Sequence, residues 1–182
     1  ALGAATVQAA LAAGARVVAI DRTEPPAGGL GQAICLGGGD LADAQAAKEA
    51  RAAAPQALGG LDALVNIAGT FRYETLVGGT LDTWDLLYRV NLRTAVAASQ
   101  AALEHLQAGG RIVNVGAASA LKAGAGIGAY TASKSGVMRL TESLAEELKE
   151  RDSTCISGLP SILDTPPNRA DVPSADFARC VE

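Results

Sequence analysis

Two side chains capable of acid–base chemistry, Tyr130 and Lys134, lie four positions apart in the second half of the chain. The segment around them has helical apolar spacing, and on a helix residues i and i+4 project from the same face. The phenol and the ammonium would therefore lie side by side. A nearby cation favours the phenolate and lowers the pKa of a tyrosine. With its pKa lowered in this way, Tyr130 could give a proton to a carbonyl oxygen or take one from an alcohol.

A Tyr-x-x-x-Lys pair alone is a weak signal, because exposed helix faces carry such pairs by chance. Its surroundings favour a functional interpretation. A run rich in β-branched residues at 111–115 predicts a buried strand, and a Gly/Ala/Ser-rich connection leads from it to the helix. The small residues 131–133 between the pair would let a ligand approach closely. The sequence thus predicts a strand, a loop and a helix over 130–149 that present the pair to a ligand.

Alternating helices and strands are predicted along the rest of the chain. A helix from Gly3 to Gly14 and an Ala-rich helix over 43–53 precede a long helix over 81–106, for which Thr80 is the expected N-cap. Apolar runs predict strands at 16–20, 33–36, 61–67 and 153–159 in addition to 111–115. This alternation is typical of an α/β fold.

In this setting the Tyr–Lys pair resembles the signature of the short-chain dehydrogenase/reductase family, and the resemblance covers almost the whole chain. It implies one Rossmann-type domain over 1–182, a doubly wound parallel sheet with helices on both faces. It also implies an NAD(H)-dependent oxidoreductase acting on a small carbonyl or alcohol. Tyr130 would be the acid/base, and Lys134 would lower its pKa and grip the nicotinamide ribose.

A further match is Asn91, within the sequence RVNLRT. In the family an Asn at this place in the long helix holds a water that extends the proton relay from the Lys. Asn is unfavourable in helix interiors by propensity, which independently indicates a purpose. The resemblance therefore adds Asn91 to the catalytic residues.

The N-terminus lacks part of the family pattern. A Rossmann unit has a strand and a glycine-rich turn before its first helix, and the pyrophosphate lies at that helix N-terminus. Gly3 matches the last glycine of the family's turn and is expected to contact the cofactor, while Ala1 stands where the preceding glycine would fall. We therefore expect the first strand to be missing and the C-terminal end to be cut short as well.

Asp21 follows the strand predicted at 16–20 and lies 18 positions after Gly3. This spacing is close to that of the acid that binds the adenosine ribose in dinucleotide-binding folds. A carboxylate there accepts hydrogen bonds from ribose hydroxyls and repels a 2′-phosphate, which favours NAD over NADP. Arg22 beside it could tolerate the phosphate. The alternative is a solvated Asp-Arg pair at a strand end.

The resemblance assigns further cofactor contacts by motif. Asp40 and Leu41 match the Asp-hydrophobic pair against the adenine, although Asp40 or Asp43 could equally be a helix N-cap. The sequence NIAG matches the family's Asn-Asn-Ala-Gly, with Ile67 replacing the second Asn. It contributes three residues, and the segment expected to close over the nicotinamide contributes three more: Asn66, Ala68, Gly69, Pro160, Ile162 and Thr165.

One departure concerns the chemistry. The family's catalytic Ser lies 13 residues before the Tyr, and here that position is Ala117; Ser119 could substitute only if the loop is rearranged. Losing an oxyanion-type donor costs about 2–4 kcal/mol in strong cases. Two alternatives follow: a reductase of the dihydropteridine reductase branch, which also lacks the Ser, or a catalytically silent member that binds nucleotide or dimerises. The C-terminal LDTPPNRADVPSADFARCVE, interpreted as a mobile substrate lid, resembles that branch.

Composition excludes several other classes of function. A net charge of −4 gives no electrostatic case for nucleic acid or an anionic membrane. No apolar run is long enough to span a bilayer, and no signal peptide is recognisable. Three widely spaced cysteines suggest neither a disulfide framework nor a zinc site, so a cytoplasmic protein with no metal is expected. The single His105 gives little support to a Ser-His-Asp hydrolase. The resemblance implies a homodimer or homotetramer built through helices 81–106 and 130–149.

Overall fold

The computed structural model describes residues 1–25, 27–165, 169 and 178. Its strands are Val18–Ile20 (β1), Ile34–Leu36 (β2), Leu61–Asn66 (β3), Leu106–Val115 (β4) and Thr154–Gly158 (β5). Its α-helices are Leu2–Ala12 (α1), Ala44–Leu58 (α2), Leu81–Leu87 (α3), Thr94–Leu103 (α4) and Gly128–Glu147 (α5). A π-helical turn, Tyr88–Arg93 (η1), joins α3 to α4, and the 3₁₀ turns Ala118–Ala120 (η2) and Lys149–Arg151 (η3) flank α5. Strands and helices therefore alternate, as the sequence predicts.

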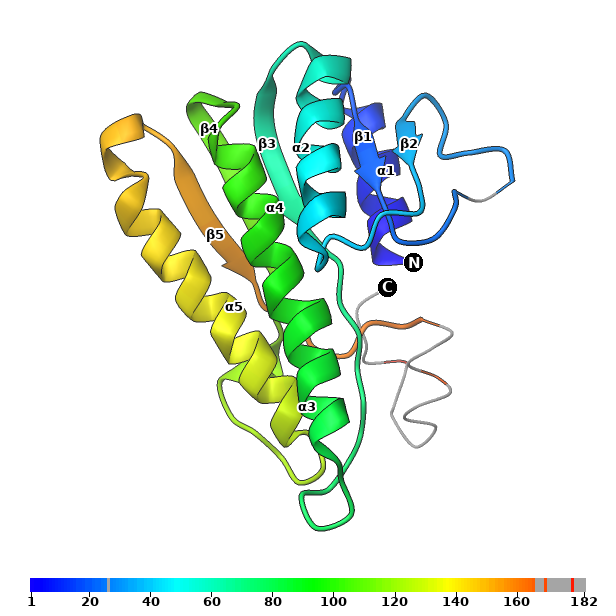
Figure 1. Cartoon of the computed structure of the whole chain (residues 1–182), viewed down its shortest axis with the longest axis vertical. Coiled ribbons are helices and arrows are strands. Elements are labelled where there is room, and N and C mark those ends of the chain that lie inside the picture. Colours follow the sequence, from blue (N-terminus) through cyan, green and yellow to red (C-terminus); the bar gives the residue numbers. More distant parts are fainter. Residues whose placement is uncertain (26, 166–168, 170–177, 179–182) are drawn as a thin grey trace.

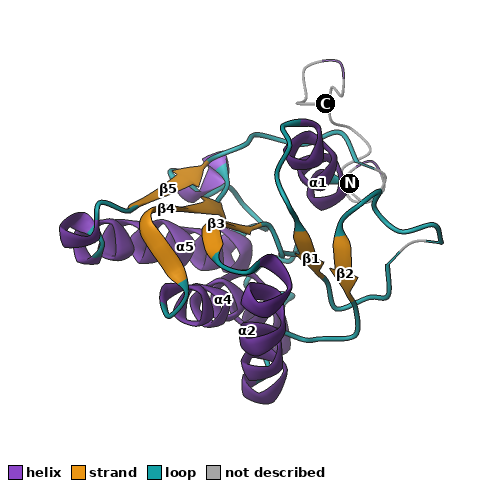
Figure 2. Ribbon diagram, turned by 90° about the horizontal axis from the view of Figure 1, so that it is seen from above, coloured by secondary structure: helices purple, strands orange, loops and turns teal. Residues whose placement is uncertain are grey.

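All the strand pairs are parallel. β1 pairs with β2, and β3, β4 and β5 form a second sheet with β4 in the middle. Both views show the order β2, β1, β3, β4, β5, with α1 on one face and α2, α4 and α5 on the other (Figures 1 and 2). β1 and β3 are not hydrogen-bonded to each other. This doubly wound α/β arrangement confirms the predicted fold class.

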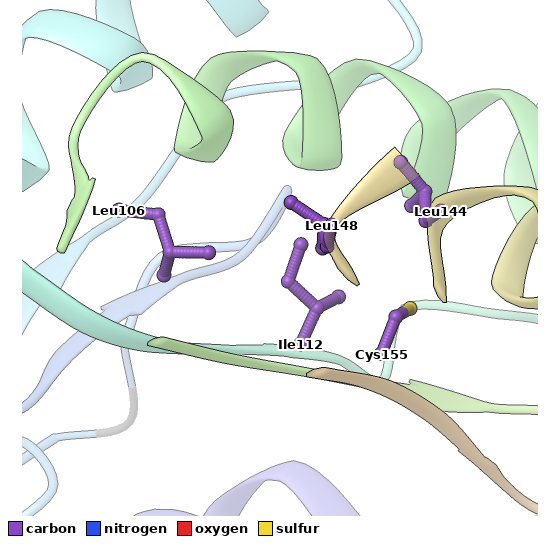
Figure 3. Close-up of a cluster of buried hydrophobic side chains, with 5 residues drawn as sticks. All are labelled: Leu106, Ile112, Leu144, Leu148 and Cys155. Atoms are coloured by element: carbon purple, nitrogen blue, oxygen red, sulfur yellow. The ribbon is translucent and has the colours of Figure 1, made fainter. Parts of the chain in front are cut away.

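The main hydrophobic cluster lies between the second sheet and the C-terminal half of α5 (Figure 3). Ile112 on β4 is fully buried, and Cys155 on β5 packs beside it against Leu144 and Leu148. Parallel strands covered by helices are expected to carry such apolar residues. This cluster anchors α5 to β4 and β5 and so fixes the position of its N-terminal turn, which carries Tyr130.

The buried face of α5 extends from this cluster to the other end of the helix. Lys134, Val137, Thr141 and Leu144 follow one another at intervals of three or four residues, and all are buried. Because this spacing repeats on one side of a helix, the side of α5 that packs on the core also carries the lysine. Lys134 is therefore placed inside the molecule by the same periodicity that places the apolar residues.

Several predicted boundaries are wrong. The long helix ends at Leu103 rather than at 106, because Leu106 begins β4 and packs into the core with 4% of its surface exposed. The strand predicted at 111–115 thus starts earlier, with an irregularity before Arg111. The helix predicted over 43–53 continues through Pro55 to Leu58 and ends at Gly59, whose φ of 71° suits a glycine.

The N-cap of α2 is Asp43, whose carboxylate accepts hydrogen bonds from the backbone N–H groups of Gln45 and Ala46. Asp40 is therefore not the cap. Thr80 precedes α3, but its side chain makes no capping hydrogen bond. Among the described residues, no helix is long and apolar enough to cross a membrane.

Candidate active site

The candidate site forms where the loops that follow β3 and β4 meet the first turn of α5 and the π-helical turn η1. The C-terminal ends of parallel strands are the usual place for ligands in open α/β sheets. Three separate parts of the sequence, around residues 69, 91 and 134, come together at this edge. Asn91 and Lys134, two of the residues predicted to be catalytic, are therefore close to each other.

Asn91 lies in η1 and is 1% exposed. Its Oδ1 accepts a hydrogen bond from the backbone N–H of Thr70 at 2.7 Å, and its Nδ2 donates to the carbonyl oxygen of Thr70 at 3.0 Å. Nδ2 also donates to Ser133 Oγ at 2.9 Å. The carboxamide thus holds the loop after β3 against α5. Single π-helical turns inside α-helices often occur at functional sites, and here the turn carries the buried Asn91.

Lys134 is 5% exposed, and its Nζ donates a hydrogen bond to the carbonyl oxygen of Val115, the last residue of β4, at 2.7 Å. Burial lowers the pKa of this amine to about 8. Gly69 lies next to the amine: a Cβ added to it would be 3.3 Å from Nζ and 3.1 Å from Asn91 Oδ1. A side chain at this position would crowd both groups, so glycine lets the loop pass close to them.

Tyr130 is half-buried, and its ring lies against that of Phe71 at a centroid distance of 5.0 Å and an interplanar angle of 78°. Burial raises the pKa of the Tyr130 phenol. The expectation of a lowered pKa for this tyrosine is therefore wrong. The physical reason is that burial opposes the charged forms of both groups, which leaves the phenol protonated and the amine easier to deprotonate.

The loop after β4 is held against the loop after β5. Gly116 N–H donates to the Gly158 carbonyl at 2.8 Å, and Ala118 N–H donates to the Pro160 carbonyl at 2.9 Å. Ala117 stands at the place of the family's Ser and is 5% exposed. Because its side chain is a methyl group, no hydroxyl is available there. Ser119 lies in the short turn η2 and is half-buried.

The other end of the same edge carries the two acids predicted to bind adenosine. Asp21 follows β1 and is exposed; its Oδ1 accepts hydrogen bonds from the N–H and the hydroxyl of Thr23, both at 2.8 Å. Asp40 lies in the loop after β2, where Oδ1 accepts from Ala42 N–H and Oδ2 forms a 3.2 Å ion pair with Arg89 of η1. The π-helical turn therefore contacts both ends of the site, through Asn91 and through Arg89.

The remaining predicted cofactor residues are less closely grouped. Gly3 lies in α1 with open space beside its Cα. Leu41 is half-buried, Ala68 is exposed, and Ile162 is exposed beyond β5. Asn66 is turned into the sheet, where its Nδ2 donates to Asn114 Oδ1 at 2.8 Å and to Ser99 Oγ at 3.2 Å. Thr165 is described, but the predicted lid at 166–168, 170–177 and 179–182 lies outside the described residues.

Sequence reasoning missed three members of the site. Phe71 gave no signal beyond its position after NIAG, and nothing in the sequence pairs it with Tyr130. Ser133 was interpreted as a small residue that makes room for a ligand. It is instead 4% exposed and its hydroxyl donates to the Tyr130 carbonyl at 2.7 Å, whereas Ala132 is exposed. Arg89 lies two residues before Asn91, and that proximity was the available signal.

Comparison with known proteins agrees with this geometry. A family model described as short chain dehydrogenase matches residues 1–175. The chain belongs to the short-chain dehydrogenase family. A relative named short-chain reductase protein NovJ, from Streptomyces niveus, is 34% identical over 174 residues, which cover 91% of this chain and 66% of the relative. The inactive 2-(S)-hydroxypropyl-CoM dehydrogenase 2 of Xanthobacter autotrophicus is 36% identical over 146 residues, covering 77% of this chain and 64% of the relative.

Solved structures of short-chain dehydrogenases have the same fold. The crystal structure of one from Burkholderia cenocepacia in complex with NADP has a TM-score of 0.81 at 34% identity, covering 96% of this chain and 74% of that one. This short-chain dehydrogenase chain spans about two thirds of the length of each of the two curated relatives named above. The predicted family is confirmed. The site residues, the dihydropteridine reductase branch, the cytoplasmic location and the assembly stay predictions.

Proposed function

We propose that this chain carries the nucleotide-binding and proton-transfer residues of an NAD(H)-dependent oxidoreductase that acts on a small carbonyl or alcohol. The observation that carries the proposal is Lys134. Burying an ammonium is costly unless the charge is well paired, and this one lies one helical turn from Tyr130, at the edge of the sheet where ligands usually bind.

The residues present fit a nicotinamide nucleotide. An ammonium has three N–H donors, and buried charges are normally paired with carboxylates or fully hydrogen-bonded. In the described part of the chain, Lys134 Nζ has the Val115 carbonyl as its hydrogen-bond partner and no carboxylate within 4.0 Å. Ribose hydroxyls would supply the missing acceptors. Gly69, beside the amine, removes the side chain that would otherwise obstruct such an approach.

When bound, the nicotinamide would supply or accept the hydride, and this chain's own residues would handle the proton. Because burial raises its pKa, the Tyr130 phenol is protonated at neutral pH and suited to donate to a carbonyl oxygen. Lys134 would bind the ribose and return a proton toward Tyr130. Asn91 would hold the loop and, as the family resemblance implies, anchor the relay water.

Asp21 supports NAD as the cofactor. The Thr23 turn holds Oδ1 and fixes the carboxylate at the end of β1, so that Oδ2 can accept a hydrogen bond from a ribose hydroxyl. The same negative charge would repel a 2′-phosphate. Fluorescence titration should give a lower Kd for NADH than for NADPH, and Asp21→Ser should reduce that preference by roughly tenfold. Equal affinities for both nucleotides in the unmodified protein would contradict the assignment of NAD.

Ala117 supports two further candidates. A pterin-type reductase needs less help from an oxyanion donor, and a silent member needs none; the similar Xanthobacter protein is itself described as inactive. Turnover of quinonoid dihydropterin with NADH, but not of ketones, would select the first. Saturable NADH binding without turnover of either substrate class would select the second. Turnover of ketones or secondary alcohols would support the main proposal.

A second copy of the chain is the proposed partner. Leu81, Trp84 and Tyr88 follow one another on one side of α3 and η1, and each exposes more than a third of its surface. An exposed apolar stripe of this kind is typical of interaction surfaces. Light scattering should show a dimer or tetramer, and Trp84→Glu should shift the protein toward monomer. A monomeric unmodified protein would contradict the assembly but not the enzymatic proposal.

A further inference from the structure

Phe71 lies outside the predicted catalytic set, and its ring packs against the ring of Tyr130. The two rings meet edge to face, with centroids 5.0 Å apart. Phe71 comes from the loop after β3, and Tyr130 comes from the first turn of α5. Edge-to-face pairs are directional and contribute beyond the area that they bury. The contact therefore constrains how the Tyr130 ring can turn.

The backbone on the Phe71 side of this contact is fixed by a buried side chain. Thr70, which precedes Phe71, has both its N–H and its carbonyl bound by the Asn91 carboxamide, at 2.7 and 3.0 Å. The carbonyl oxygen of Phe71 itself accepts a hydrogen bond from Arg72 Nη1 at 2.7 Å. The peptide group that precedes Phe71 is therefore held by a buried side chain, so the ring approaches Tyr130 from a defined position.

The backbone on the Tyr130 side is fixed from the same carboxamide. Asn91 Nδ2 donates to Ser133 Oγ at 2.9 Å, and Ser133 Oγ donates to the Tyr130 carbonyl at 2.7 Å. The contacts thus form a closed ring that runs from Asn91 through Thr70, Phe71, Tyr130 and Ser133 back to Asn91. Phe71 is the member of this ring that touches the reacting side chain rather than the backbone.

We propose that Phe71 is a positioning residue, which holds the Tyr130 phenol in its reactive orientation through the edge-to-face contact. The proposal rests on the proposed function, because Tyr130 must be the proton donor for its orientation to affect turnover. A lost ring contact would let the phenol leave the line of proton transfer without changing the affinity for nucleotide. The effect should therefore appear in kcat rather than in KM or in the Kd for NADH.

The test compares Phe71→Ala, Phe71→Leu and Phe71→Tyr with the control Tyr73→Ala. Tyr73 lies on the same loop but packs over Gly126 and is 64% exposed. The assay uses NADH with the first ketone or dihydropterin that the unmodified protein turns over. Phe71→Ala should lower kcat by roughly three- to tenfold, with KM and the Kd for NADH unchanged. Phe71→Tyr keeps the aromatic ring and should have the kcat of the unmodified protein. Tyr73→Ala should also leave kcat unchanged.

A second readout needs no turnover. The chain has three tyrosines, so ring ¹³C labelling gives few signals, and Tyr130→Phe identifies the one from Tyr130. Phe71→Leu should shift that signal because it removes a ring current, whereas Tyr73→Ala should not. An unmoved Tyr130 signal, or a change in KM alone, would overturn the role of Phe71. A shifted signal in a protein that turns over no substrate would support the contact and contradict only the proposed function.

Discussion

The two ends of the proposed nucleotide-binding edge are built differently. At the end proposed to be catalytic, Asn91 and Lys134 are buried, and each hydrogen-bonds to backbone of another element. At the end proposed to bind adenosine, Asp21 is exposed and bound to its own turn, and Asp40 is held by an ion pair with Arg89, whose side chain is 53% exposed. One end is fixed by the interior of the protein, and the other lies in solvent.

This difference indicates which properties each end controls. Buried polar groups are costly to change, because a lost partner leaves another buried group unsatisfied. Exposed ion pairs are screened by water and salt, and contribute little. The catalytic end should therefore tolerate few substitutions, whereas the adenosine end can change cofactor preference without loss of the fold. The π-helical turn η1 belongs to both, since it carries Asn91 and Arg89.

The largest expected effect tests whether the buried end is catalytic. Tyr130→Phe removes the proposed proton donor but keeps the ring against Phe71. It should lower kcat by about 10²–10⁴-fold, while NADH binding measured by fluorescence titration changes by no more than a few-fold. Tyr88→Phe, at an exposed position on η1, is the matched control and should keep its activity. Full activity of Tyr130→Phe would show that Tyr130 is not the proton donor and that the buried end is not catalytic.

The second effect comes from the buried amine. The pKa of Lys134 is about 8 in the folded protein against 10.5 for an unperturbed lysine, so between these values the unfolded chain binds more protons. Stability should therefore rise with pH over this range, and the cost of burying the charge should be fully present below pH 8. Relative to Lys134→Met, the unmodified protein should gain up to about 3 kcal/mol between pH 8 and 10.5.

Urea unfolding of both proteins across this pH range measures the effect of the amine. Lys122→Met, at an exposed position in the loop before α5, is the control and should follow the unmodified protein at every pH. A difference between the unmodified protein and Lys134→Met that does not vary with pH would show that the amine is solvated. The amine of Lys134 would then be as accessible to water as the charged groups of the exposed end.

The third effect compares a buried amide with an exposed one in the same long helix. Asn91→Leu removes the hydrogen bonds to Thr70 and Ser133 and should lower the free energy of unfolding by about 2–3 kcal/mol. Gln100→Leu, on the exposed side of α4, should change it by no more than about 0.5 kcal/mol. Equal effects at the two positions, measured by urea unfolding, would contradict the structural role of the carboxamide.

The smallest effect is expected at the adenosine end. Arg89→Gln breaks the ion pair with Asp40 and should lower the free energy of unfolding by about 1 kcal/mol or less, because both side chains reach solvent. A double-mutant cycle with Asp40→Asn isolates the pair, and its coupling should fall in high salt. A coupling of several kcal/mol that is insensitive to salt would show that this ion pair is shielded from solvent, as the buried contacts are.

The sequence by itself determined the fold class and most of the elements, because the apolar periodicity and glycine punctuation are local properties. Residue type and spacing predicted a role for Tyr130 and Lys134, and the family resemblance added Asn91; the structure brings Asn91 and Lys134 together beside Gly69. The sequence could not place the end of the long helix, because Leu106 is apolar in either conformation and only its packing in the core selects the strand.

The tertiary structure alone decided the environment of the site. Burial raises the pKa of Tyr130 and lowers that of Lys134, and burial depends on every element packed around the two groups. Phe71 is distant from Tyr130 in sequence and meets it in the fold, where Asn91 holds the loop that carries Phe71. Spacing along one helix can predict which side chains share a face, but contacts between elements and the exclusion of water arise only when the whole chain has folded.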